Sequence, residues 1–230
     1  MKILKSIIII LLAVLVSSCT TSKYTRGEQY PKFYEEQPTT LLVMPPINNT
    51  TDVEAKDLLY TSISRPLAEA GYYVISPHLA MDIFKSESAY DAELFLDNGV
   101  SEFGKVFGAD AVVFSVINKW KKVGVGIETD IRYVVKSTRT NEILFDRSCD
   151  LFLDLSVGNY GNNSLVAQLA SLTATLINTA ITEKIVAARR CNYYILRDIP
   201  RGKYNPLYLQ DQDVKAEKKD VQAVVRELVY

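Results

Sequence analysis

The chain has 230 residues, a formal net charge of −1 at pH 7 and 48% hydrophobic residues. This length fits one compact domain with extensions, or at most two small domains, and it is enough to bury a core without disulfides or metals. Because the sequence carries no excess of basic residues, its composition argues against nucleic acid as a partner.

The first residues have the pattern of a secretory signal. Lys2 and Lys5 precede Ile7–Val16, an aliphatic run too short to span a membrane, and Val16-Ser17-Ser18-Cys19 follows it. We expect residues 1–18 to be a lipoprotein signal peptide that is removed. Cys19 is then acylated, with palmitate as one chain, and anchors the protein to a membrane. A plain secreted protein and a short signal anchor are the alternatives.

Residues 19–38 are polar and have no hydrophobic period, which predicts a flexible tether. The folded domain is expected over residues 39–209, where short apolar strands alternate with helical stretches. The predicted strands are Leu41–Met44, Tyr72–Ile75 and Asp110–Trp120, and the predicted helices are Val53–Ala70, His78–Lys85 and Val100–Phe107.

Apolar residues recur at every second position from Val125 to Val135 and again from Ile143 to Leu153, mostly alternating with polar residues. This period of two predicts a long antiparallel hairpin, turning over Thr138–Asn141, with one buried face and one wet face. Arg147 falls on the apolar side, so we expect it at an edge or against a carboxylate. The predicted fold class is α/β, a single domain whose mixed sheet contains this hairpin and is covered by helices.

The stretch Leu165–Ile185 is nearly free of charge and has apolar residues at helical spacing, which predicts a buried helix lying on the sheet. Membrane contact is the alternative, although its polar side chains make that costly. Asn192–Leu209 is rich in tyrosine and proline and is expected to run over the surface. Residues 210–230 form a charged C-terminal tail.

A partner surface is predicted where amphipathic tyrosines gather. Together with the tail, it would comprise Tyr193, Tyr194, Tyr204 and Tyr208. The alternative is that these tyrosines pack on their own domain and the tail is disordered. Cys149 and Cys191 either pair as a disulfide in an oxidising compartment or remain two buried thiols.

No convincing catalytic site emerges from the sequence. His78 is the single histidine, so a histidine metal cluster is impossible and any Ser-His-Asp triad would need it. We therefore expect no catalytic residues, no metal and no cofactor. One acidic group is predicted to be solvated surface, and it consists of Asp82, Glu87, Asp91 and Glu93. A second group is also predicted to be solvated surface, with binding of calcium or a basic partner as the alternative. It consists of Asp146, Asp150 and Asp154.

Three segments, Thr40–Asn49, Arg65–Ser76 and Phe107–Val116, resemble an uncharacterised bacterial lipoprotein family whose best-known type is a genome-derived neisserial surface antigen. The resemblance covers roughly residues 30–209. It implies a fold similar to the N-terminal domain of TolB and to the curli secretion lipoprotein CsgG. The glycine-rich segment of the family is reduced here to Gly158 and Gly161.

The resemblance and the predicted anchor together imply a non-enzymatic protein of the outer membrane. Thr20, which follows the anchor cysteine, favours delivery to the outer membrane, with the periplasmic face expected and the cell surface as the alternative. The implied role is a component or accessory of an envelope assembly or secretion system. Other envelope proteins, CsgG-like lipoproteins or a second copy would be its partners. A binding module for a small ligand or an envelope polymer is the second hypothesis, and a hydrolase using His78 is the third.

Overall fold

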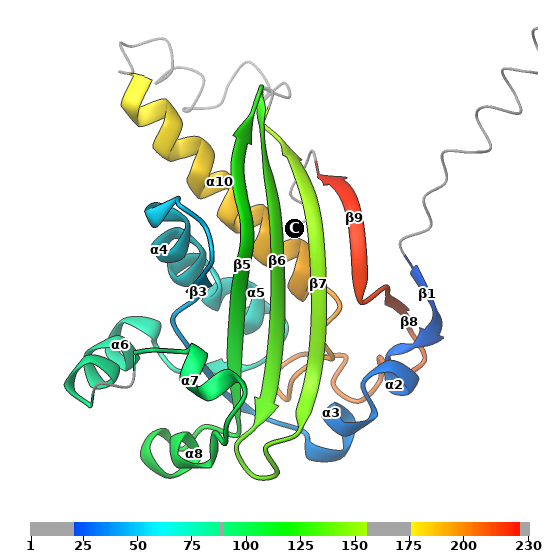
Figure 1. Cartoon of the computed structure of the whole chain (residues 1–230). Helices are drawn as coiled ribbons and strands as arrows, with labels where there is room; N and C mark the ends of the chain where they lie inside the picture. Colours follow the sequence, from blue (N-terminus) through cyan, green and yellow to red (C-terminus); the bar gives the residue numbers. More distant parts are fainter. Residues whose placement is uncertain (1–20, 88–89, 156–175, 226–230) are drawn as a thin grey trace, which may run out of the picture.

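The computed structural model describes residues 21–87, 90–155 and 176–225, and it is a mixed α/β domain built on one sheet (Figure 1). The main sheet has the strand order β4-β2-β5-β6-β7-β9, and β3 also pairs with β5. Its strands are β2 Thr40–Val43, β3 Ile47–Asn48, β4 Tyr73–Val74, β5 Ala111–Val123, β6 Gly126–Ser137, β7 Ile143–Asp154 and β9 Asp220–Val225. A separate two-stranded ribbon pairs β1 Thr21–Thr25 with β8 Lys215–Glu217.

Three long antiparallel strands, β5, β6 and β7, form the centre of the sheet, and parallel strands flank them on both sides. The predicted hairpin is therefore confirmed as β6 and β7, and β5 extends it to three strands. In Figure 1 these strands rise together and curve along the length of the domain. The alternating pattern decides their faces, because odd-numbered residues of β6 such as Ile127, Ile131 and Tyr133 are buried.

Helices cover one face of the sheet fully. The helix α10 Leu176–Leu196 crosses this face diagonally, and it packs against α4 Val53–Ser62, α5 Ser64–Glu69, β6 and β7. Ala187, Ala188, Cys191 and Ile195 are its buried contacts with the core. The predicted cover helix thus exists in its second half and runs further, to Leu196. Residues 165–175 of that prediction lie outside the described residues.

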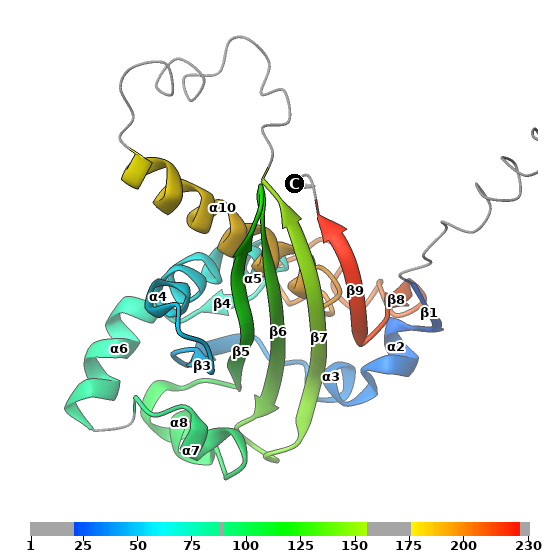
Figure 2. The same ribbon diagram turned by 45° about the horizontal axis from the view of Figure 1, so that its top comes forward.

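A second group of helices covers part of the other face. These are α6 Pro77–Ser86, α7 Glu93–Leu96 and α8 Ser101–Phe107. Phe84 and Phe103 pack with Leu42, Phe114 and Val134 in a core separate from the first. In Figure 2, which is turned by 45° from Figure 1, these helices stay on the side of β2 and β5 and do not reach β7 or β9.

The N-terminal segment differs from the predicted tether, because it is folded from Thr21 onward. After β1, α2 Arg26–Gln29 and α3 Pro31–Glu36 place Tyr30 and Phe33 in the main core, where they are 2% and 3% exposed. A capping box at Thr25 and Glu28 starts α2. The segment has no hydrophobic period because its helices are short and are held by single buried residues such as Arg26, Tyr30 and Phe33.

The C-terminal segment also differs from the predicted tail, since β8 and β9 both belong to the fold. Val221 and Val225 of β9 are buried against β7, to which β9 pairs in parallel. Asn192–Leu196, predicted as surface chain, is the last turn of α10. Among the charged residues that suggested a tail, Lys215, Lys218, Lys219 and Asp220 are exposed, whereas Asp211 is buried.

Arg147 lies in the core and meets the carboxylate that its position predicted. Its side chain is fully buried, and its Nη2 atom lies 3.3 Å from Oε2 of Glu217. Its Nη1 atom donates to the carbonyl oxygens of Tyr194 and Ile195 at 2.8 and 2.7 Å. Arg147 therefore satisfies the unpaired carbonyls at the C-terminal end of α10 with a cation, which suits that end of the helix dipole.

Candidate interaction surface on the open face of the sheet

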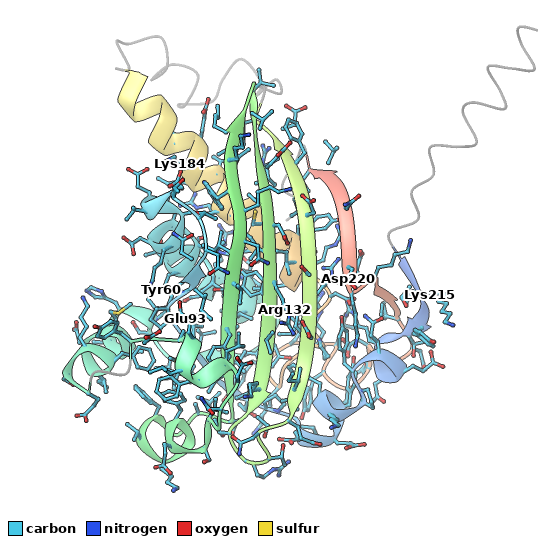
Figure 3. All side chains as sticks on the ribbon, in the orientation of Figure 1. Tyr60, Glu93, Arg132, Lys184, Lys215 and Asp220 are labelled. Carbon is cyan, nitrogen blue, oxygen red and sulfur yellow. The ribbon has the colours of Figure 1, made fainter. Side chains whose placement is uncertain are left out.

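One part of the sheet has side chains that no described helix covers. The cover given by α6, α7 and α8 ends near Lys136, whose ammonium donates to the carbonyl oxygens of Leu96 and Asn98 at 2.9 and 2.6 Å. Beyond it, the even-numbered residues of β6 and β7 face outward, and Arg132 stands in the middle of this area (Figure 3). We call this area the open face. It consists of Lys119, Lys121, Glu128, Asp130, Arg132, Asp146, Ser148, Asp150, Phe152, Asp220, Gln222 and Val224.

Strand register places charged residues of the open face directly beside one another. Asp130 of β6 lies opposite Asp150 of β7, with Lys119 on its other side. In the next row, Arg132 lies opposite Ser148, which in turn lies opposite Asp220 of β9. Like charges directly opposite each other destabilise a sheet. The pair Asp130 and Asp150 therefore indicates a surface kept for something other than stability.

Ion pairs neutralise only part of this charge. Arg132 makes a bidentate pair with Asp146, with Nε to Oδ1 at 2.8 Å and Nη2 to Oδ2 at 2.6 Å, and this hydrogen bonding raises the pKa of the guanidinium. Lys119 lies 3.4 Å from Asp150, and the Ser148 hydroxyl donates to Asp130 at 3.4 Å. Carboxylates outnumber cations on the open face, so it presents a net negative surface beside the exposed apolar side chain of Val224.

Metal binding receives no support as an explanation of these carboxylates. Within residues 21–87, 90–155 and 176–225, no group of three acidic, histidine or cysteine side chains is arranged to hold a metal ion. Asp146 forms an ion pair with Arg132, and Asp150 forms one with Lys119. Solvated surface and contact with a basic partner are the two interpretations that match the charge.

The four tyrosines of the predicted partner surface do not form one exposed patch. Tyr193 donates its hydroxyl to Glu69 at 2.7 Å, and Tyr208 donates to Gln37 at 2.9 Å. The ring of Tyr194 lies 5.5 Å from the guanidinium of Arg147 and 4.2 Å from that of Arg197. Tyr204 alone of the four is strongly exposed, at 66%.

Cys149 and Cys191 are both free thiols in the structure and do not form a disulfide. Cys191 lies with its sulfur 3.3 Å from the hydroxyl of Thr129. Burial raises the pKa of Cys149 to about 11 and that of Cys191 to about 12, so neither forms a thiolate readily.

The other sequence candidates lie apart from the open face. His78 is exposed in the first turn of α6. Asp91 and Glu93 are exposed neighbours, and the hydrogen bond between them, with some desolvation, raises the pKa of Glu93. No described contact brings these three together. Cys19, the predicted lipidation site, lies outside the described residues.

The alternating pattern of the hairpin predicts that Asp130, Arg132, Asp146 and Asp150 lie on its solvent-facing side. It does not predict β9. Its signal was present, since Val221, Ala223 and Val225 alternate with Gln222 and Val224. The two buried valines are also four residues apart, a spacing that equally suits a helix stripe. Pairing with β7 decides between the two readings.

Comparison with known proteins gives the family. Residues 28–190 match the profile of the GNA1162-like lipoproteins, and the chain belongs to that family. A relative, the lipoprotein NMB1124/NMB1162 of Neisseria meningitidis serogroup B, is 25% identical over 185 residues, which span 79% of this chain and 85% of the relative. The family identified from the sequence is thereby confirmed.

Two solved structures show distant similarity to this chain. The crystal structure of lipoprotein GNA1162 from Neisseria meningitidis superposes with a TM-score of 0.46 at 24% identity, covering 63% of this chain and 97% of that one. The C-terminal domain of LpoB from Salmonella enterica superposes with a TM-score of 0.33 at 15% identity, covering 54% and 93%. Likenesses this weak carry no conclusion about function. In the part of the chain that the structure describes, no helix is long and apolar enough to cross a membrane.

Proposed function

We propose that this lipoprotein is anchored to the outer membrane through Cys19 and acts in the periplasm as a non-enzymatic docking protein for envelope assembly or secretion. Membership of a lipoprotein family supports the anchor, as does the sequence Val16-Ser17-Ser18-Cys19. Intact mass of the purified protein tests this part. Acyl chains on Cys19 are expected, and an unmodified mature chain would reject the anchor.

The open face is the observation that supports docking. The side of a sheet that is covered by other elements is usually apolar, whereas the open face is uncovered and charged. A basic surface on a partner protein would neutralise Asp130 and Asp150 and would gain contact with Phe152 and Val224. Electrostatic attraction of this kind speeds association and selects the partner more than it adds affinity.

The experiment is a charge reversal on the open face. Asp130→Lys with Asp150→Lys should abolish recovery of the partner bound by wild-type protein, while membrane attachment stays unchanged and a cooperative melting transition shows that the variant is folded. The matched control is Asp82→Lys with Glu102→Lys on α6 and α8, which changes the same charge away from the open face. Equal recovery with both double variants would reject docking through this face.

The loop after α10 is the competing surface. Tyr204 is 66% exposed there and Leu207 is 53% exposed, so this loop keeps part of the predicted tyrosine surface. Tyr204→Ala is therefore a third arm of the same experiment. Loss of the partner with Tyr204→Ala alone would move the docking site to this loop. Recovery of a second copy of the chain would identify the partner as the protein itself.

A further inference from the structure

We infer that the ribbon of β1 and β8, with the turn that follows it, rests against an anionic lipid surface. The inference depends on the proposed acylation of Cys19. Only one residue separates Cys19 from Thr21, the first residue of β1. Since an extended chain advances about 3.5 Å per residue, the two Cα atoms lie at most about 7 Å apart. An acylated Cys19 therefore holds β1 at the headgroups.

The ribbon is fixed firmly to the rest of the domain, so the anchor sets the orientation of the whole protein. Thr21 pairs with Glu217 and Thr25 pairs with Lys215. The backbone nitrogens of Arg26 and Gly27 continue this pairing by donating to the carbonyl oxygens of Val214 and Gln212 at 2.8 and 2.9 Å. A flexible tether would have decoupled the domain from the membrane, and this ribbon does not.

The surface of the ribbon has the chemistry that suits a headgroup region. Lysines provide attraction to phosphate, while a tyrosine of β1 and the valine just before β8 provide an apolar component. Lys215 points away from the domain in Figure 3, and Tyr24 and Val214 are each 46% exposed. The exposed lysines of this surface are Lys23, Lys215, Lys218 and Lys219.

These lysines have no carboxylate partner among the described residues; Lys23 and Lys219 instead lie 4.7 Å from the ring of Tyr24 and 6.0 Å from the ring of Tyr30. Among the described residues, none of the four forms an ion pair. The nearest carboxylate on β8, Glu217, is already held by Arg147 and Arg197 at 3.3 and 2.9 Å. The exposed carboxylates of Asp213 and Asp220 offset part of the positive charge. Each lysine near an anionic surface strengthens binding about fivefold, and this gain falls off over roughly 10 Å.

The test compares lysine labelling in the anchored protein with labelling in the unanchored chain. Full-length lipidated protein is placed in vesicles of phosphatidylcholine and phosphatidylglycerol, and a membrane-impermeant amine reagent is followed at each lysine by mass spectrometry. The reference is the chain from residue 20 to 230, which keeps every described residue. Lys23, Lys215, Lys218 and Lys219 should label several times more slowly in the anchored protein. Lys85 and Lys105, on α6 and α8, should label equally in both.

A variant pair tests whether charge holds the contact. Lys218→Glu with Lys219→Glu should speed the labelling of Lys215, whereas Lys85→Glu with Lys105→Glu should not. In Figures 1 and 2, α6 and the ribbon lie on opposite sides of the domain, which makes these two positions a suitable control. Acylated protein whose ribbon lysines label at reference rates would reject this inference and leave the anchor standing. Protein without acyl chains would reject the anchor itself.

Discussion

Arg26 and Asp198, which are 172 residues apart, form a buried ion pair with Nε of the guanidinium 3.4 Å from Oδ1 of the carboxylate. The same guanidinium lies 2.9 Å from Asp211 through Nη1, and Tyr30 donates its hydroxyl to Asp198 at 2.7 Å. These contacts join the first helix of the fold to the segment after α10. The ribbon of β1 and β8 depends on this junction.

Removing Arg26 should therefore destabilise the protein strongly. Arg26→Ala leaves two buried carboxylates without their cation, and breaking a buried pair in this way costs about 3–5 kcal/mol. The loss is measured by urea unfolding. The control is Lys105→Ala, which breaks an exposed pair with Glu102 and should change the free energy of unfolding by at most about 1 kcal/mol. Equal losses in the two variants would show that the junction is not structural.

A chain that ends at Gln210 should not fold cooperatively. It lacks Asp211, β8 and the buried residues Val221 and Val225 of β9. The expected loss is comparable to the whole stability of a typical domain, about 5–15 kcal/mol. The control is a chain that ends at Val225, which keeps Asp211, β8 and β9 and should unfold cooperatively. A cooperative transition of the shorter chain at the wild-type midpoint would contradict the place of β9 in the sheet.

The hairpin is expected to carry core stability through its packed face. Ile131 is fully buried between the sheet and α10, so Ile131→Ala should cost about 2–5 kcal/mol. Val125→Ala, on the exposed tip beside β6, should cost no more than about 0.5 kcal/mol. Both are measured by thermal or urea unfolding. A variant at Ile131 that unfolds like wild type would reverse the assignment of the two faces.

Most of the sheet can be predicted from the sequence because its long strands are regular. The alternation from Val125 to Leu153 fixes which side chains are buried, whatever the neighbouring strands are. The two ends cannot be predicted in this way. The strand Thr21–Thr25 is defined by pairing with Lys215–Glu217, and Asp220–Val225 is defined by pairing with β7. Thr21–Thr25 has too few apolar residues to reveal a strand, and the apolar spacing of Asp220–Val225 suits a helix stripe as well as a strand.

The sequence also predicts only part of the candidate site, namely which residues share a face and not how the strands pair. The period of two places Asp130, Asp146 and Asp150 on one wet face, and Arg132 beside them. It does not give the register that sets Asp130 opposite Asp150 or adds Asp220 from a distant segment. Such pairings depend on the relative positions of separate strands, which no local pattern encodes.

The two core thiols should be unreactive in the folded protein. Cys149 and Cys191 are fully buried, and their raised pKa values keep them protonated. A thiol reagent at pH 8 should modify neither one until urea unfolds the protein, and should then modify both. A pair of cysteines that stays unmodified after unfolding without reductant would indicate a disulfide.

Alkaline pH should weaken the fold through the same thiols. Below the ordinary thiol pKa of 9.0 both states hold the proton, so the thiols do not affect stability. Above it the unfolded chain ionises first, while folded Cys149 ionises only near pH 11, so the free energy of unfolding falls as pH rises through this window. Replacing both cysteines by alanine should make this part of the pH profile less steep, the remaining slope coming from buried tyrosines such as Tyr60, whose pKa burial also raises. An unchanged slope would contradict the assigned cause.

The docking role of the open face is tested most directly by a photocrosslinking residue at Gln222, which is exposed at the outer edge of β9. In living cells this position should give a discrete crosslinked product. That product should disappear when Asp130→Lys and Asp150→Lys are added, while the same residue at Ser86 on α6 gives no such product. No product at Gln222, or one that survives the charge reversal, would contradict the proposal that this face binds a basic partner.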